Sequence, residues 1–91
     1  MTFEITYHRL VVREDIPLLG GRMKRQIKHA IETRLMTSPE LYGKPLRKSL
    51  TGYRKLRVGD YRVIFRIQGA RVKIFIIGHR SWVYEKIMQR L

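Results

Sequence analysis

Basic side chains recur at alternate positions in one stretch of the sequence, "GYRKLRVGDYRVIFRI", residues 52–67. The stretch holds a single acid, Asp60, against five cations: Arg54, Lys55, Arg57, Arg62 and Arg66. The sequence Val58-Gly59-Asp60 at its centre predicts a tight turn between two strands. Guanidinium groups grip phosphate oxygens in a bidentate way. A β-hairpin of this composition therefore predicts a phosphate-binding surface.

Two interpretations of these cations remain open. Like charges that face each other on a sheet repel and destabilise it, so the fold itself gains little from keeping them together. That favours a binding site. Alternatively, long basic side chains splay into water and discourage edge-to-edge aggregation.

The charge of the whole chain is strongly basic and unevenly placed. The net charge is +13, from 20 Lys and Arg against 7 Asp and Glu. Residues 1–43 hold 7 basic and 5 acidic residues, whereas residues 44–91 hold 13 and 2. This asymmetry indicates a polyanionic partner, either nucleic acid or an acidic protein. An anionic membrane is not expected, because the cations fall on predicted strands and not on one amphipathic helix.

Composition excludes several classes of protein. The chain has no cysteine, so disulfides and thiolate metal sites are absent. No apolar run approaches the roughly 20 residues of a membrane helix, and the first ten residues lack the apolar core of a signal peptide. His8 and His29 lack metal-ligand spacing. We therefore expect a soluble, cytoplasmic protein without a metal or a small-molecule cofactor.

Hydrophobic periodicity predicts seven elements in one domain, residues 1–91. These are a strand at 2–7, a helix beginning at 10 and limited by Pro17, a helix at about 22–36, strands on both sides of Gly59, a strand at 71–78 and a helix at about 81–91 with Ser81 as its N-cap. The order β, α, α, β, β, β, α predicts an α+β fold. We expect two N-terminal helices and a C-terminal helix on one face of a mainly antiparallel four-stranded sheet.

Alternation along the strands predicts which side chains share a face. In the strand at 71–78, Val72, Ile74 and Ile76 should oppose Lys73, Phe75 and Ile77. The face left open by the helices should collect cations from three adjacent strands: Lys55, Arg57, Arg62, Arg66 and Lys73.

The segments "LRKSLTGYRKLRVGDYRVIFRI" and "IIGHRSWVYEKI" are similar to the C-terminal half of the RelE/ParE superfamily of bacterial toxins. Within it, the chain most resembles the RelE-type mRNA interferase toxins. The resemblance implies a RelE-like, microbial RNase-like fold and a cognate antitoxin. It also implies metal-independent mRNA cleavage on the ribosome, in which a 2′-hydroxyl attacks the adjacent phosphodiester.

The resemblance also implies site residues. Lys55 matches the proposed general base or phosphate contact, and Arg62 matches a ligand of the transition-state phosphate. Arg80 matches the proposed general acid or charge stabiliser. Tyr84 matches a tyrosine that stacks on a base, as aromatic rings do with unstacked RNA. Further RNA contacts are expected from the remaining cations of the strands: Arg54, Arg57, Arg66 and Lys73.

Two positions depart from the family pattern. Some members carry a second lysine where this chain has Tyr53, and His79 directly precedes Arg80. Histidine titrates near neutral pH, so His79 is a further candidate for the acid or base. Two alternative functions remain: a ParE-like inhibitor of DNA gyrase without nuclease activity, and a catalytically decayed nucleic-acid-binding module of the same fold.

Overall fold

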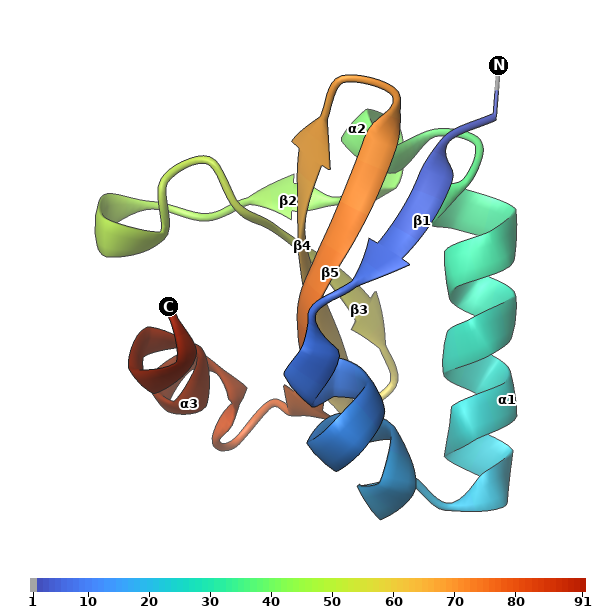
Figure 1. Cartoon of the computed structure of the whole chain (residues 1–91), viewed down its shortest axis with the longest axis vertical. Coiled ribbons are helices and arrows are strands. Elements are labelled where there is room, and N and C mark those ends of the chain that lie inside the picture. Colours follow the sequence, from blue (N-terminus) through green and yellow to red (C-terminus); the bar gives the residue numbers. More distant parts are fainter. Residues whose placement is uncertain (1) are drawn as a thin grey trace.

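The structure, a computed structural model, describes residues 2–91 as a five-stranded sheet with helices around it (Figure 1). The strand order is β1-β5-β4-β3-β2. β1 runs parallel to β5, and the other neighbouring pairs are antiparallel. The strands span Glu4–Tyr7 (β1), Lys44–Pro45 (β2), Arg54–Val58 (β3), Tyr61–Gln68 (β4) and Arg71–His79 (β5). The predicted α+β class and mainly antiparallel sheet are confirmed.

The number of strands differs from the expected four, because β2 lies between the predicted helix at 22–36 and the hairpin, where no strand was expected. It has only two residues and pairs with the start of β3. Pro45 lacks an N–H group and is tolerated because β2 is an edge strand. A pair of residues is too short to show alternation in a sequence.

Helical segments fill the connections. After β1 come a π-helical turn, η1 (Val11–Asp15), and a 3₁₀ turn, η2 (Ile16–Leu18). The long predicted helix is confirmed as α1 (Gly21–Ala30), which continues as the π-helical turn η3 (Ile31–Leu35). The remaining segments are α2 (Pro39–Tyr42), the 3₁₀ turn η4 (Lys48–Leu50) and α3 (Val83–Arg90). No helix within residues 2–91 is long and apolar enough to cross a membrane.

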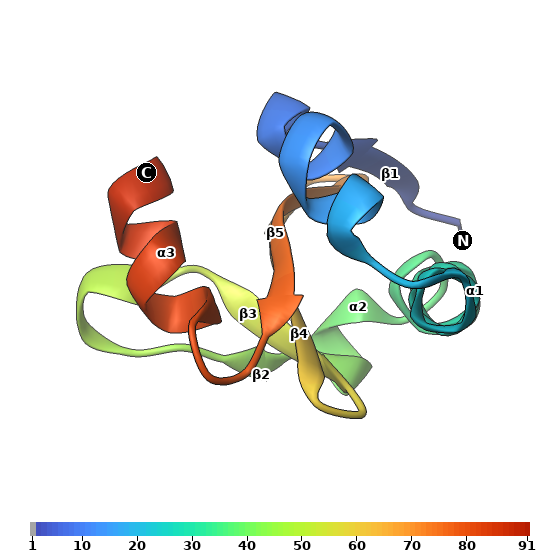
Figure 2. The ribbon, with the colours of Figure 1, turned by 90° about the horizontal axis from the view of Figure 1, so that it is seen from below.

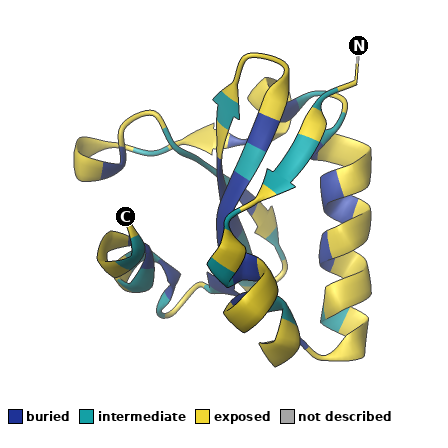
Figure 3. Cartoon of the chain, viewed as in Figure 1, coloured by how far each residue is buried: buried dark blue, intermediate teal, exposed yellow. Residues whose placement is uncertain are grey.

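The helices cover both faces of the sheet, so the expectation that they pack on one face is wrong. α1 and α3 lie on opposite sides of the strands (Figure 2). A first core forms under α1, η1 and η3 and includes Val11, Ile27, Leu35, Val63, Phe65 and Val72. A second core forms under α3 and comprises Leu50, Ile64, Phe75, Ile76, Val83 and Ile87. Figure 3 shows the result: buried positions follow the central strands, and α1 turns an exposed face to water.

The pairing of β5 with β4 shifts by one residue at Phe75, and this shift changes which β5 side chains enter the second core. One extra residue reverses the alternation of the strand beyond it. Ile76 consequently packs with Phe75 in the second core, and Ile77 packs in the first. The predicted alternation, with Ile76 on the face of Ile74, is wrong beyond this bulge. Nothing in the residue types of β5 marks the position of the extra residue.

A buried ion pair closes the edge of β5 beyond the end of β1. The carboxylate of Asp15 in η1 accepts two hydrogen bonds from the guanidinium of Arg90 in α3, at 2.8 and 2.9 Å. The same groups bind the backbone at the bulge, since Arg90 donates to the Phe75 carbonyl and the Ile77 N–H donates to Asp15. Both side chains are at most 2% exposed. We call this pair the clamp.

The predicted hairpin turn is confirmed. Val58 pairs with Tyr61, which leaves Gly59-Asp60 as a two-residue loop. Gly59 has a φ of +59°. A glycine at positive φ in the first loop position matches the right-handed twist of the flanking strands. This turn brings Arg57 on β3 directly opposite Arg62 on β4.

Candidate active site

The site starts from one contact between the sheet and α3. The ammonium group of Lys55 on β3 lies 5.6 Å from the centre of the Tyr84 ring. Tyr84 is in the first turn of α3, and that turn is held on the sheet by Val83 in the second core. Both side chains are half-buried, so each still presents a surface to solvent. A cation and an aromatic face therefore meet at the border between the sheet and the helix.

Two arginines extend this border toward the hairpin turn. Arg57 and Arg62 face each other on neighbouring strands, on the face that carries Lys55. The guanidinium of Arg62 donates hydrogen bonds to the carbonyls of Gly59 and Tyr61, both at 2.9 Å. The turn thus fixes Arg62 against the repulsion of its neighbour.

Arg80 joins the same turn from the end of β5. Its backbone N–H donates to the Asp60 carbonyl at 2.8 Å, and its side-chain Nε lies 3.5 Å from the Asp60 carboxylate. The two side chains are 63% and 69% exposed. An exposed pair of this kind contributes at most about 1 kcal/mol, so an incoming phosphate can replace Asp60 as the partner of Arg80.

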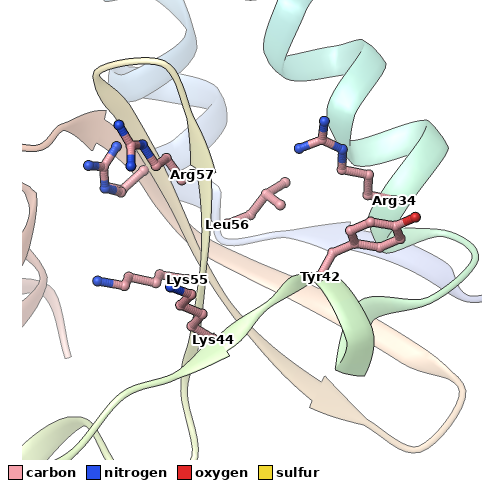
Figure 4. Close-up of a pocket in the computed structure, with 7 residues that line it drawn as sticks. Arg34, Tyr42, Lys44, Lys55, Leu56 and Arg57 are labelled. Atoms are coloured by element: carbon pink, nitrogen blue, oxygen red, sulfur yellow. The ribbon is translucent and has the colours of Figure 1, made fainter.

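A pocket of about 250 Å³ lies along the free edge of β3 beyond the end of β2. Figure 4 shows Lys44, Lys55 and Arg57 on one side of the strand and Leu56 turned to the other, toward Arg34 and Tyr42. Sequence reasoning missed three of the polar residues that line it: Arg34, Tyr42 and Lys44. Arg34 and Tyr42 lie within helical segments, and their position near β3 depends on the tertiary fold alone. Lys44 belongs to β2, which was not predicted.

The electrostatics of the site are those of an anion receptor. We call Lys44, Lys55, Arg57 and Arg62 the basic cluster. Within residues 2–91 none of the four forms a salt bridge, and no acid lines the pocket. Unpaired cations that surround one space stabilise negative charge there, and their effect is strongest on charge that develops during a reaction. The arrangement can hold a phosphodiester beside an aromatic ring.

The structure separates the other predicted contacts from this cluster. Arg66 and Lys73 face each other at the far end of β4 and β5, where they lie over the rings of Tyr53 and Phe75 at 5.5 and 5.2 Å. Arg54 is on the opposite face of β3, and its guanidinium donates to the Gly43 carbonyl at 2.9 Å. Its contacts hold the end of α2. Arg66 and Lys73 thus form a second basic patch, and the guanidinium of Arg54 is bound to the backbone at the end of α2.

His79 also faces away from the basic cluster. It pairs with Tyr61, whose ring meets the imidazole edge-on at 5.6 Å and packs on the first core. Nδ1 of His79 accepts a hydrogen bond from the Ser81 N–H and lies 2.8 Å from the Ser81 hydroxyl. Ser81 was predicted to cap α3, which is wrong. The N-cap is Trp82, without a side-chain cap, because the hydroxyl of Ser81 is turned back to the imidazole.

The protein-family model for the ParE toxin of the type II toxin–antitoxin system, parDE, matches residues 6–84 of the chain. The chain belongs to the RelE/ParE family of type II toxins. Toxin RelG of Mycobacterium tuberculosis is 30% identical over 76 residues, which is 81% of this chain and 87% of RelG. Toxin RelE of the same organism is 44% identical over 52 residues, about half of each protein (55% and 54%). The predicted superfamily is confirmed.

Solved structures of RelE/ParE toxins share the fold. The RelBE2 toxin–antitoxin complex of Mycobacterium tuberculosis matches with a TM-score of 0.81 and 28% identity, over 89% of this chain and 94% of that chain. A mutant of the Escherichia coli toxin RelE in the free state matches with a TM-score of 0.74 and 18% identity, over 99% and 94%. The second likeness concerns the fold alone. The domain described above is therefore a RelE-like fold.

Proposed function

We propose that this type II toxin is an endoribonuclease that cuts mRNA on the ribosome by 2′-hydroxyl attack without a metal. The observation that carries the proposal is the contact of Lys55 with the Tyr84 ring beside Arg57 and Arg62. A nuclease of this kind needs a stacking surface for a base and cations for the adjacent phosphate. A protein that inhibits by binding alone has no need for either in one place.

Each residue has a definite part in the proposed reaction. The ring of Tyr84 holds one base, and the Lys55 ammonium binds the phosphate beside it while the proton of the 2′-hydroxyl passes to water. The 2′-oxygen then bonds to phosphorus as the bond to the 5′-oxygen breaks. Arg62 and Arg57 stabilise the charge on the phosphate oxygens, and Arg80 stabilises the departing 5′-oxygen, which takes a proton from water. The products are a cyclic phosphate and a 5′-hydroxyl.

The ribosome supplies what this site lacks. Its side chains provide charge and stacking, but in-line attack also requires an RNA strand that is held splayed. Proximity and orientation are worth about 7–11 kcal/mol of a reaction barrier. We therefore propose that mRNA held in the ribosomal A site is the substrate and that the net charge of +13 attracts the toxin to ribosomal RNA.

A cognate antitoxin is the second proposed partner. Several similar structures are toxin–antitoxin complexes, among them RelBE2 of Mycobacterium tuberculosis and RelB-RelE of Methanococcus jannaschii. An acidic segment of such a partner would neutralise the basic cluster by charge complementarity. Expression of the toxin alone should arrest growth, and co-expression of the antitoxin should restore it. Normal growth with abundant folded toxin would argue against the proposal.

The decisive experiment compares mRNA on translating ribosomes with the same mRNA free of protein. Purified toxin should cut the ribosome-bound mRNA rapidly and the naked mRNA slowly or not at all, and ribosome binding should weaken as salt rises. Arg80→Ala and Tyr84→Ala should each abolish most cleavage and keep the fold. Arg22→Ala, which removes an exposed cation at the start of α1, is the charge-matched control. Efficient cleavage of naked RNA would point to a free-standing ribonuclease.

A second candidate is ParE-like inhibition of DNA gyrase, because the matching family model is that of the ParE toxin. A supercoiling assay with purified gyrase separates the two. Gyrase inhibition without mRNA cleavage would replace the endonuclease. Neither activity, with intact fold and RNA binding, would indicate a catalytically decayed binding module.

A further inference from the structure

α3 is too short to be stable without tertiary contacts. It has eight residues, Val83–Arg90, and no side-chain cap at its N-terminus. Isolated helices shorter than about 12–15 residues are marginal in water. Its place on the sheet therefore depends on tertiary contacts, and these contacts decide where Tyr84 lies.

The contacts fall on one face of the helix. Val83, Ile87 and Arg90 are spaced four and three residues apart, which puts them on one side of a helix. The first two fill the second core. Arg90 makes the third contact, and its side chain is only 2% exposed. Two aliphatic side chains resist separation from the sheet but resist rotation and fraying poorly, because apolar packing is non-directional.

Arg90 adds directional bonds at the C-terminal end. Its guanidinium contacts both oxygens of Asp15 and the carbonyl of Phe75, at 2.8–2.9 Å. Asp15 is fixed in turn by the Ile77 N–H at 3.0 Å. Three separate elements, η1, β5 and α3, are thus joined through one planar group. Such bidentate pairs specify geometry as well as energy.

We propose that Asp15 and Arg90 are positioning residues, which act through Tyr84 by fixing the rotation and docking of α3. Tyr84 lies six residues before Arg90, about 9 Å along the helix axis. It directly follows Val83, which is on the buried face of α3. A small rotation of α3 carries its ring away from the Lys55 ammonium. The inference rests on the proposed ribonuclease function, but the docking of α3 can be measured without it.

Two variants loosen the clamp without leaving a lone buried charge. Arg90→Lys keeps the charge but cannot reach both Asp15 oxygens and the Phe75 carbonyl with one planar fork. The double variant Asp15→Asn with Arg90→Gln removes both charges and keeps hydrogen-bonding groups. Arg71→Met is the matched control, because it breaks an exposed pair with Glu4 (3.6 Å) that does not touch α3.

The docking of α3 has its own reporters. Trp82, the sole tryptophan, packs over Gly78 at the start of the helix, so its emission follows docking. Amide exchange of residues 83–90 follows fraying. In both clamp variants we expect altered Trp82 emission and faster exchange in 83–90, with a larger increase there than in β4. Unchanged exchange in 83–90 would overturn the inference.

Activity on ribosome-bound mRNA tests the positioning role. The clamp variants should lower kcat at least tenfold and change KM less than twofold, while Arg71→Met leaves both unchanged. In a Tyr84→Ala background the clamp substitutions should have no further effect on kcat, since they act through that ring. The positioning role would be overturned if the clamp substitutions still lowered kcat tenfold in the Tyr84→Ala variant. It would also be overturned if a clamp variant with a frayed α3 kept the wild-type kcat. If the wild-type toxin cuts no mRNA, the proposed function and the positioning role both fail, and the exchange data still decide whether the clamp docks α3.

Discussion

The clamp and the basic cluster use the same kind of side chain in opposite ways. Arg90 is almost fully buried, and a carboxylate and a carbonyl satisfy its guanidinium. Arg57 and Arg62 lie on the open part of a strand face, directly opposite each other, without an acid. Burial of a charge is tolerated only when it is paired. Charges that remain unpaired at a surface can attract an oppositely charged ligand.

The clamp therefore stabilises the fold of this small domain, whereas the basic cluster is available to bind a ligand. The cross-strand Arg57–Arg62 pair destabilises the sheet by a few tenths of a kcal/mol to about 1 kcal/mol. The clamp joins the N-terminal and C-terminal segments across β5. Removal of an arginine should therefore lower the free energy of unfolding at the clamp and lower the activity at the basic cluster.

The largest effect is expected in the clamp. Arg90→Ala leaves Asp15 as an uncompensated buried charge and frees the Phe75 carbonyl, so the free energy of unfolding should fall by about 3–5 kcal/mol. Arg71→Ala, at an exposed ion pair, should change it by less than about 1 kcal/mol. Urea denaturation followed by far-UV circular dichroism measures both. Similar losses for the two variants would erase the contrast between buried and exposed pairs.

The basic cluster should show the reverse. Arg62→Ala should reduce mRNA cleavage by about 10²–10³-fold, the cost of losing one preorganised charge at a transition state. Its free energy of unfolding should stay within about 0.5 kcal/mol of wild type, because repulsion from Arg57 is relieved as two turn contacts are lost. Cleavage rates and urea midpoints are measured on the same preparations. A strongly destabilised Arg62→Ala would place this arginine with the clamp and not with the site.

A substitution at Gly78 tests the link between the two regions. A Cβ at this position would lie 2.5 Å from the Trp82 ring, so the ring and the start of α3 must move. Overpacking of this kind costs about 1–3 kcal/mol. Gly78→Ala should lower the thermal midpoint and, by displacing Tyr84, reduce cleavage more than its stability loss explains. Gly20→Ala, where a Cβ would meet nothing within 4 Å, is the control.

The smallest effect concerns His8, beside the clamp. Burial lowers the pKa of His8 below its ordinary value of 6.5, helped by Arg90, Lys73 and Arg9 and opposed by Asp15. The unfolded chain then binds a proton that the folded chain resists, so stability falls as pH drops through 6.5. His8→Asn should lose less free energy of unfolding than wild type between pH 7.5 and pH 5. Urea titrations at the two pH values measure it, and identical losses would contradict the prediction.

Local signals in the sequence were enough for the elements that carry a repeating pattern. The apolar stripe predicted the helix across α1 and η3, and the Val58-Gly59-Asp60 turn predicted the hairpin, with Arg57 and Arg62 on one face. The bulge at Phe75 left no such signal, because an extra residue between two apolar positions is as apolar as its neighbours. The predicted alternation therefore placed Ile77, and not Ile76, with Phe75 on the face that α3 covers.

The site was predicted only as far as residues lie on one hairpin or match the family. Lys55 and Tyr84 were named separately, but their contact depends on how α3 returns to the sheet. Asp15 and Arg90, 75 positions apart, carry no mark that distinguishes them from surface charges. Pairs at such separation are set by topology, which composition and periodicity do not encode.

The parallel pairing of β1 with β5 also has a consequence for how the chain folds during its synthesis. Ile5 meets Val72 in the sheet, and Asp15 meets Arg90 beyond it. Contacts at such sequence separation form slowly, since chain entropy is lost before they are made. During synthesis, the first strand must wait until β5 has left the exit tunnel, and the clamp waits longer still. In a toxin assembled in this order, α3 docks after the strands of the sheet have formed, which gives a partner protein time to meet an incompletely folded chain.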